Sequence, residues 1–305
     1  MKPTLILSLL ISASAFGDKF TDKYNALKKA GNQKAIEKFL EDSSNKEADN
    51  PNYYATAGNY WWGAATERVQ MGALPAGEFQ LDPNDLSIID PKTGKKVGSI
   101  GSLPKGQSEK GKKALGILKT GAKKFPNRAD ISMGLAHLQK ESKLTEDYVT
   151  TLVGLLGHAK KSPRSLKWMN DEKLPKPAEE FLPESIQPYS VALFKQETPA
   201  TDKLCSQLLD AITNTYPDHP YAYNLKAALA DANGKSGEAL KMLEIAYTKN
   251  PNDSLVLSNL AASYVRQDKK DRAIRAYKKL LTLKIEPGRR KEAEAALKEL
   301  SEKTK

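Results

Sequence analysis

Cysteine and histidine are scarce in this chain of 305 residues, which contains one cysteine, Cys205, and three histidines. A single cysteine excludes a framework of internal disulfides. His137, His158 and His219 are far apart, and none belongs to a His/Glu or Cys/His spacing that is typical of a metal site. We therefore expect no metal ion, and we expect Cys205 to be a buried structural thiol.

Complete catalytic and cofactor motifs are also lacking. The segment 101–108 has the glycine spacing of a phosphate-binding loop, but Gln107 stands where that loop needs its lysine. Asp82, Asn84 and Asp85 are similar to the start of a calcium loop that lacks its turn glycine and its last glutamate. No nucleophile-elbow motif is present. We expect no catalytic residues, no cofactor and no enzyme activity.

Long apolar runs are absent except at the N-terminus. Met1-Lys2 is followed by the run Leu5–Ile11, which is apolar apart from Ser8, and by the small residues 13–15, an order that is typical of a secretory signal peptide. The run is shorter than the ~20 residues of a membrane span. We therefore expect residues 1–15 to be a signal peptide, no transmembrane segment after its cleavage, and a periplasmic or secreted protein. The alternative is an ordinary apolar first helix.

A sequence repeat is present in the second half. Cys205, Ala239 and Ala273 are equally spaced, and each is followed four residues later by a large side chain. Those large side chains are Leu209, Leu243 and Tyr277, and the units end near Pro217, Pro251 and Pro287. This order, at an interval of about 34 residues, resembles the tetratricopeptide repeat (TPR). Together with the expected signal peptide, it makes the chain similar to TPR proteins of the exported bacterial type. The resemblance implies stacked pairs of antiparallel helices that bind other molecules.

The apolar spacing predicts helices independently of any family. Leu257, Leu260, Ala261 and Tyr264 recur at i, i+3, i+4 and i+7, and a second such helix follows the polar residues 267–270. Weaker copies predict helices over 20–30, 33–40, 131–141 and 145–159, and another first helix from Pro51. The expected fold is all-α, a TPR-like solenoid of helical pairs with an inserted β-hairpin at about 78–104.

The insert interrupts one repeat. Residues 78–81, 86–89 and 97–100 are short β-like runs, and Pro91 and Gly94 between the last two are typical of a turn. We expect this β-hairpin to lie between the two helices of one pair. Two roles stay open, a ligand-binding face and a cover over an apolar edge.

A second interruption spans residues 162–201 and contains six prolines. Prolines disfavour long helices, so we expect a linker with one short helix at 186–194. The predicted organisation is therefore a signal peptide (1–15), N-terminal helical repeats (16–161) with an insert at 70–108, a proline-rich linker (162–201), C-terminal TPR-like repeats (202–288) and a basic capping helix (289–305).

The TPR resemblance also implies which side chains line the concave groove of the array. It places Tyr54 and Trp61 in the core and turns a set of polar and aromatic residues toward a ligand. The candidate ligand-binding residues are Asn52, Asn59, Trp62, His137, Tyr221, Asn224, Ser258 and Arg266. The lysine and asparagine clamp that some TPR proteins use for a peptide carboxylate is not reproduced. The alternative for Trp62 and its neighbours is an aromatic core beneath the insert.

Positive charge is concentrated in two stretches of a chain whose formal net charge is +11. Residues 105–128 contain eight basic residues and one acidic residue, and residues 266–305 contain fourteen and seven. Such patches attract acidic proteins or polyanions, although most exposed lysines are simply solvated. We expect no nucleic acid as a partner, because no nucleic-acid-binding motif accompanies the charge.

These features together predict a non-catalytic, exported TPR scaffold or adaptor that binds a protein or peptide in its concave groove. The first alternative is a glycan- or polyanion-binding protein that uses Trp62, the insert and the basic patches. The second is a hydrolase of an unrecognised kind, which would require titratable residues clustered in a cleft between insert and groove.

Overall fold

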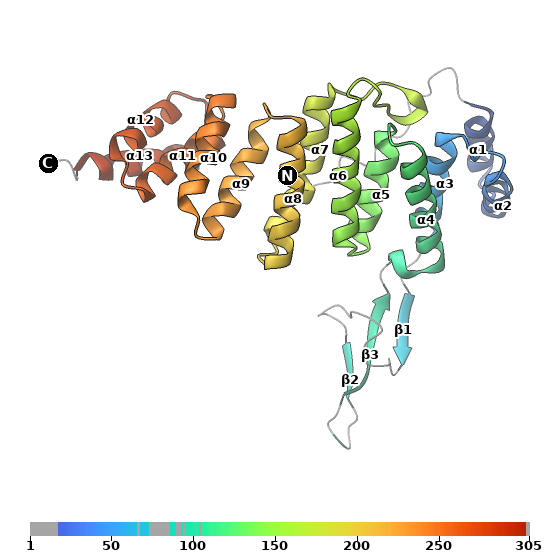
Figure 1. Ribbon diagram of the computed structural model, residues 1–305. Coiled ribbons are helices and arrows are strands. Elements are labelled where there is room, and N and C mark those ends of the chain that lie inside the picture. Colours follow the sequence, from blue (N-terminus) through green and yellow to red (C-terminus); the bar gives the residue numbers. More distant parts are fainter. Residues whose placement is uncertain are drawn as a thin grey trace. The chain divides into compact units, whose positions relative to one another are not determined.

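The computed structural model describes residues 18–65, 68–72, 86–89, 93, 96–103 and 105–302 (Figure 1). The chain divides into two units. The first contains residues up to 151 together with 167–173, and the second contains 152–166 together with 174–305. The expected signal peptide lies outside the described residues.

The first unit is built from helices that pack in pairs. They are α1 (Lys19–Lys29), α2 (Gln33–Ser43), α3 (Pro51–Ala64), α4 (Glu109–Lys124), α5 (Ala129–Glu141) and the start of α6 (Thr145–Lys161), with two short 3₁₀ turns, η1 (Lys105–Gln107) and η2 (Met169–Asp171). Side-chain caps begin several of them: Asp18, Asn32 and Ser108 accept hydrogen bonds from backbone N–H groups three residues later. The predicted helices over 20–30, 33–40, 131–141 and 145–159 are confirmed to within two or three residues.

Helices α3 and α4 form one pair although the insert separates them in sequence. Two glycines allow their close approach. A Cβ atom at Gly58 would lie 2.5 Å from Cγ of Leu118, and one at Gly121 would lie 2.6 Å from Cβ of Tyr54. Tyr54 and Trp61 are buried in the same cluster, as predicted. The two helices therefore pack as one repeat, and the insert is an extension of the loop that connects them.

Between α3 and α4 the chain forms three antiparallel strands, β1 (Arg68–Gly72), β2 (Leu86–Ile89) and β3 (Lys96–Leu103), in the order β1-β3-β2 (Figure 1). Strands β2 and β3 pair from Leu86↔Ile100 to Ile89↔Lys96, with an irregularity between Ile88 and Ile89. Strand β1 was not predicted, because Arg68–Gly72 has few apolar residues and no turn signal. The predicted run 78–81 lies outside the described residues.

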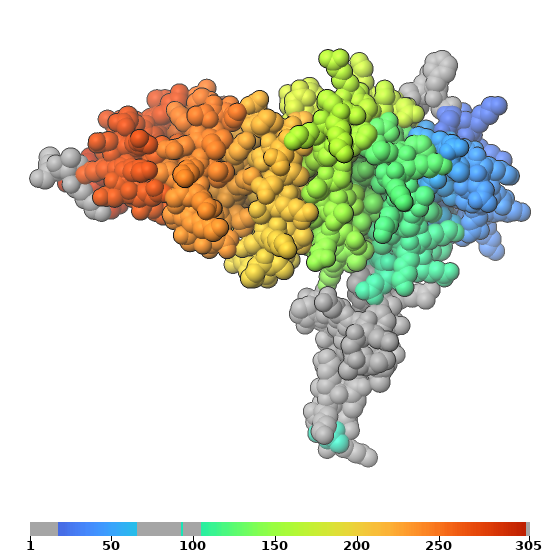
Figure 2. Space-filling view, viewed as in Figure 1, coloured from blue at the N-terminus to red at the C-terminus, as the bar shows by residue number. Residues whose placement is uncertain are grey.

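The second unit continues the pairing. It contains the rest of α6, then α7 (Ala178–Phe194), α8 (Pro199–Thr215), α9 (Pro220–Ala232), α10 (Ser236–Lys249), α11 (Ser254–Arg266), α12 (Lys270–Leu281) and α13 (Pro287–Glu302). Figure 2 shows the side chains of these later helices packed into a continuous surface. The three small residues of the repeat, Cys205, Ala239 and Ala273, are all fully buried. The predicted helical repeat is confirmed in this unit.

The prediction of one short helix at 186–194 is wrong. Helix α7 begins at Ala178 and contains Pro183 and Pro188 in its interior. Each proline removes one backbone hydrogen bond, which normally costs ~3 kcal/mol or more. Leu182, Ile186 and Leu193 are fully buried at helical spacing, so packing against α8 stabilises a helix that the local sequence disfavours. Residues 178–194 are thus a member of the repeat array and not only a linker.

Candidate functional site

The first helices of the last pairs present a common surface. Along α9 and α11, residues at spacings of three, four and seven lie on one side of each helix. We call the surface formed by Tyr221 and Asn224 on α9 and by Leu255, Ser258 and Val265 on α11 the first-helix face. It includes three of the four candidate residues that the TPR resemblance assigned to this unit, and the fourth, Arg266, lies at its edge.

Contacts between neighbouring first helices hold the polar members of this face in place. Asn259 Nδ2 donates a hydrogen bond to Oδ1 of Asn224 over 2.9 Å. The hydroxyl of Tyr221 donates to the backbone oxygen of Gln187 on α7 over 3.2 Å, and burial raises the pKa of that hydroxyl. The phenol therefore stays protonated at neutral pH and acts as a fixed donor. These residues join consecutive repeats, which orients the face.

Arg266 forms an ion pair with Oδ2 of Asp231 on α9. The guanidinium is thus neutralised and does not give the face a net positive charge. The other oxygen of Asp231, Oδ1, is buried and receives no hydrogen bond among the described residues. A buried acceptor without a donor is costly, and because this oxygen is buried it is not accessible to a bound segment.

Apolar side chains are exposed on the same face. Leu255 is 45% exposed and Val265 is 41% exposed, and within residues 18–65 and 105–302 only one other large apolar side chain, Leu144, is comparably exposed. Ser258, which is partly buried, lies between them on α11. An apolar strip next to fixed polar groups is the usual composition of a peptide-binding surface. Ser258 was predicted from the sequence and Val265 was not, because a lone valine in an amphipathic helix gives no signal of exposure.

The candidate residues of the first unit lie on α3 and α5 and are described separately. Asn52 donates to Oδ2 of Asp18 over 2.9 Å. Burial would raise the pKa of Asp18, but hydrogen bonds from Thr21, Asn52 and Asn50 outweigh it and lower that pKa. Asn52 therefore supports the cap of α1, and the structure gives it a packing role.

The other three differ in their surroundings. Trp62 is partly buried and packs against the aromatic cluster, and the ammonium group of Lys105 lies 5.1 Å from the centre of its ring. Asn59 is exposed on the same side of α3. His137 is partly buried on α5. Trp62 thus belongs partly to the core, as the alternative interpretation held, and keeps only part of its ring for a ligand.

Potential metal-ligating side chains are scattered over the described residues. No group of three or more His, Cys, Asp or Glu side chains in that part of the chain is placed to hold a metal ion. The buried Cys205 donates its S–H to the backbone oxygen of Ser190 over 3.5 Å, and burial raises its pKa to about 12. None of the described helices is long and apolar enough to span a bilayer.

Comparison with known proteins gives only distant likenesses. No family model and no curated protein matches the sequence. Among solved structures, MamA from Desulfovibrio magneticus RS-1 is 18% identical, with 57% of this chain and 86% of that one covered at a TM-score of 0.36. A thermophilic TPR protein from Thermus thermophilus is 17% identical, with 60% and 89% covered at 0.36. YrrB, described as a TPR protein with an unusual peptide-binding site, is 13% identical, with 61% and 83% covered at 0.38.

These TM-scores are below 0.5. The assignment of TPR-like repeats therefore depends on this chain's own features, which are the constant repeat interval, the buried small residues at that interval and the helix pairs.

Proposed function

We propose that this TPR-like repeat protein is a non-catalytic scaffold that binds a protein or peptide on the first-helix face of α9 and α11. The observation that supports it best is the exposure of Leu255 and Val265, at 45% and 41%, on a helix whose other side is buried. Exposed large apolar side chains that adjoin fixed polar groups indicate a surface that is covered in a complex.

The chemistry of the face defines the partner. Leu255 and Val265 lie ten residues apart on α11, which corresponds to a separation of about 15 Å along the helix. They are suited to two apolar side chains of one bound segment. The proposed partner is therefore an amphipathic or extended segment with two separated apolar residues and no strong negative charge.

We further propose that the protein acts outside the cytoplasm. The support is the order of basic, apolar and small residues over 1–15, which is that of a cleaved signal peptide. Mass spectrometry of the protein purified separately from the cytoplasm, the envelope and the medium of a bacterial host tests this. A chain that begins at Phe16 supports export, and an intact N-terminus in the cytoplasmic fraction refutes it.

The binding proposal is tested with a photo-crosslinking amino acid at position 258. The matched control has the same amino acid at Lys278, which is exposed on α12, a second helix. We expect a defined protein to be captured from the source organism's extract only through position 258. We also expect that capture to be lost in Leu255→Ser, Val265→Ser.

Equal capture through both positions would refute the first-helix face as the binding surface. Retention only of polyanions, in low salt and unaffected by the Leu255 and Val265 substitutions, would instead favour the glycan- or polyanion-binding alternative, because screening weakens charge-driven binding.

A further inference from the structure

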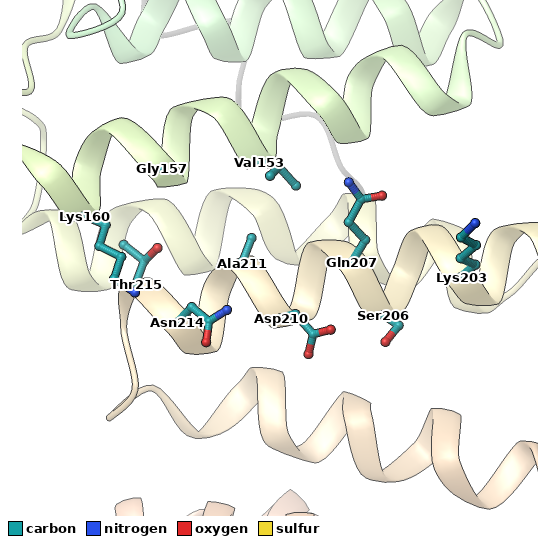
Figure 3. Close-up of a pocket in the computed structure, with 10 residues that line it drawn as sticks. All are labelled: Val153, Gly157, Lys160, Lys203, Ser206, Gln207, Asp210, Ala211, Asn214 and Thr215. Atoms are coloured by element: carbon teal, nitrogen blue, oxygen red, sulfur yellow. The ribbon is translucent and has the colours of Figure 1, made fainter.

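A second surface of the same unit is hollowed between α6 and α8. The cavity has a volume of about 560 Å³. Both helices are second helices of successive pairs, so this groove is distinct from the first-helix face. Every lining residue belongs to the second unit, and we call this feature the α6/α8 groove (Figure 3).

Small side chains line part of the groove. Gly157 and Val153 line it from α6, and Ala211 lines it from α8. A Cβ atom built at Gly157 would meet no atom within 4 Å. The space above this glycine is therefore open, and a large side chain introduced there would occupy the groove without a backbone clash.

The groove carries uncompensated positive charge. Lys160 and Lys203 both line it and are exposed, and neither has an ion-pair partner among the described residues. The acidic residue of the lining, Asp210, is already paired, because its Oδ1 lies 2.5 Å from Nζ of Lys226. A ligand with negative charge is thus favoured at two positions.

The two lysines lie at opposite ends of the groove, Lys203 at one and Lys160 beside Thr215 at the other (Figure 3). Lys203 and Thr215 are twelve residues apart on α8, a rise of about 18 Å. An extended chain covers this length with about six residues. Between the ends, Gln207 and Asn214 contribute side-chain amides, which both donate to and accept from a peptide backbone.

We propose that the α6/α8 groove binds an extended peptide segment of about six residues that carries carboxylates at both ends and small neutral residues between. The charge pattern favours a peptide over a uniform polyanion. A glycosaminoglycan or a nucleic acid matches a continuous row of cations, whereas the lining between the two lysines presents amides, an alanine, a glycine and the already paired Asp210.

The test uses two fluorescein-labelled peptides of eight residues and identical composition. One carries two aspartates at each end around four alanine and serine residues, and the other carries all four aspartates in the middle. Binding is followed by fluorescence polarisation in about 0.05 and about 0.15 M salt, because screening separates charge-driven from other binding. We expect the first peptide to bind saturably and at least fivefold more tightly than the second.

Two pairs of variants assign the binding to the groove. Lys160→Glu, Lys203→Glu is compared with Lys241→Glu, Lys278→Glu, which changes the net charge equally at exposed lysines of the same unit that lie outside the groove. Gly157→Phe is compared with Gly154→Phe, since both glycines of α6 have open space and only Gly157 lines the groove. Circular dichroism shows which variants keep the wild-type helix content.

We expect at least a tenfold loss of affinity in Lys160→Glu, Lys203→Glu and in Gly157→Phe, and less than a twofold change in the two controls. Three results would overturn the proposal: no saturable binding of the first peptide, equal affinity for both peptides, or equal losses in the groove variants and their controls. Tighter binding to heparin or to phosphatidylglycerol vesicles, with the same response in every lysine variant, would assign the charge to a general polyanion surface instead.

Discussion

At the residue scale, glycines decide how closely α3 and α4 pack. Gly121 is buried, and a Cβ atom there would lie 2.6 Å from Cβ of Tyr54, an atom that is fixed close to the backbone. Gly116 lies on the same helix, is exposed, and would place its Cβ in open space. Substitutions at these two positions therefore distinguish the effect of interhelical packing on stability from the effect of helix propensity.

We predict that Gly121→Ala lowers the free energy of unfolding by about 1–3 kcal/mol, because the added methyl group overpacks the interface. Gly116→Ala should raise it by about 0.5–1 kcal/mol, because alanine is the better helix former and meets no atom. Urea unfolding followed by circular dichroism measures both. Stabilisation by Gly121→Ala would show that α3 and α4 leave room for a methyl group beside Tyr54.

A buried ion pair at the start of α5 is the second feature of this scale. Arg128 is fully buried, and its Nε and Nη2 each lie 2.9 Å from a carboxylate oxygen of Asp130. A weaker contact joins Arg128 to the exposed Asp171 over 3.4 Å. This pair was not predictable from the sequence, because Arg-x-Asp is common on solvated surfaces.

Removal of one partner leaves a buried charge uncompensated. We predict that Asp130→Ala lowers the free energy of unfolding by about 3–5 kcal/mol, and that the double variant Arg128→Leu, Asp130→Ala recovers most of that loss. Chemical unfolding of the two variants gives the comparison. A double variant as unstable as Asp130→Ala would mean that Arg128 acts through its apolar packing.

At the element scale, the ends of the first helices follow one geometry. Gly234 after α9 has φ +73°, and Asp268, at the equivalent position of the next repeat, has φ +53°. In both turns the backbone N–H of the following residue donates to a carbonyl oxygen in the last turn of the helix. Lys235 donates to Ala230, and Lys269 donates to Tyr264. This is a Schellman motif, whose left-handed residue favours glycine.

We predict that Asp268→Gly stabilises the protein by about 0.5–1 kcal/mol, because glycine adopts a positive φ without steric cost. Gly234→Asp should destabilise it by a similar amount. Thermal melting of both variants is the measurement. Destabilisation by Asp268→Gly would indicate that the aspartate side chain stabilises the turn more than the strain costs.

At the scale of the whole molecule, each unit has its own buried cluster, one around Trp61 and Leu118 and one around Leu243 and Tyr277. The chain provides a separate probe for each. All three tryptophans, Trp61, Trp62 and Trp168, belong to the first unit, and the one cysteine, Cys205, belongs to the second.

We predict that deletion of residues 287–305 destabilises mainly the second unit. Helix α13 contributes the buried Ala293 and the partly buried Leu297 and Leu300 to the cluster of α12, and loss of such contacts costs ~2 kcal/mol or more. Labelling of Cys205 by a thiol reagent should therefore occur at lower urea, whereas the tryptophan transition should shift less. Equal shifts of both probes would show that the units unfold as one.

The sequence by itself determined the repeat. The constant interval between Cys205, Ala239 and Ala273 places a small side chain at the same point of each helix pair. All three side chains are fully buried, so the phase of the repeat and the burial of these positions could be inferred from the residues alone. The helix ends at Gly31 and Gly234 were also predictable locally, because glycine adopts the positive φ that a helix end often requires. Both glycines do have a positive φ.

Only the tertiary structure decided the features that depend on contacts distant in sequence. Helix α7 forms despite Pro183 and Pro188 because its buried leucine and isoleucine side chains pack against α8. Asn52 is hydrogen-bonded to Asp18, a residue distant in sequence. Leu255 and Val265 are exposed because neighbouring helices cover the other side of α11 and leave this side open. The α6/α8 groove arises from the same cause: its glycine, alanine and lysines have no shared motif, and only the spacing of two helices brings them together.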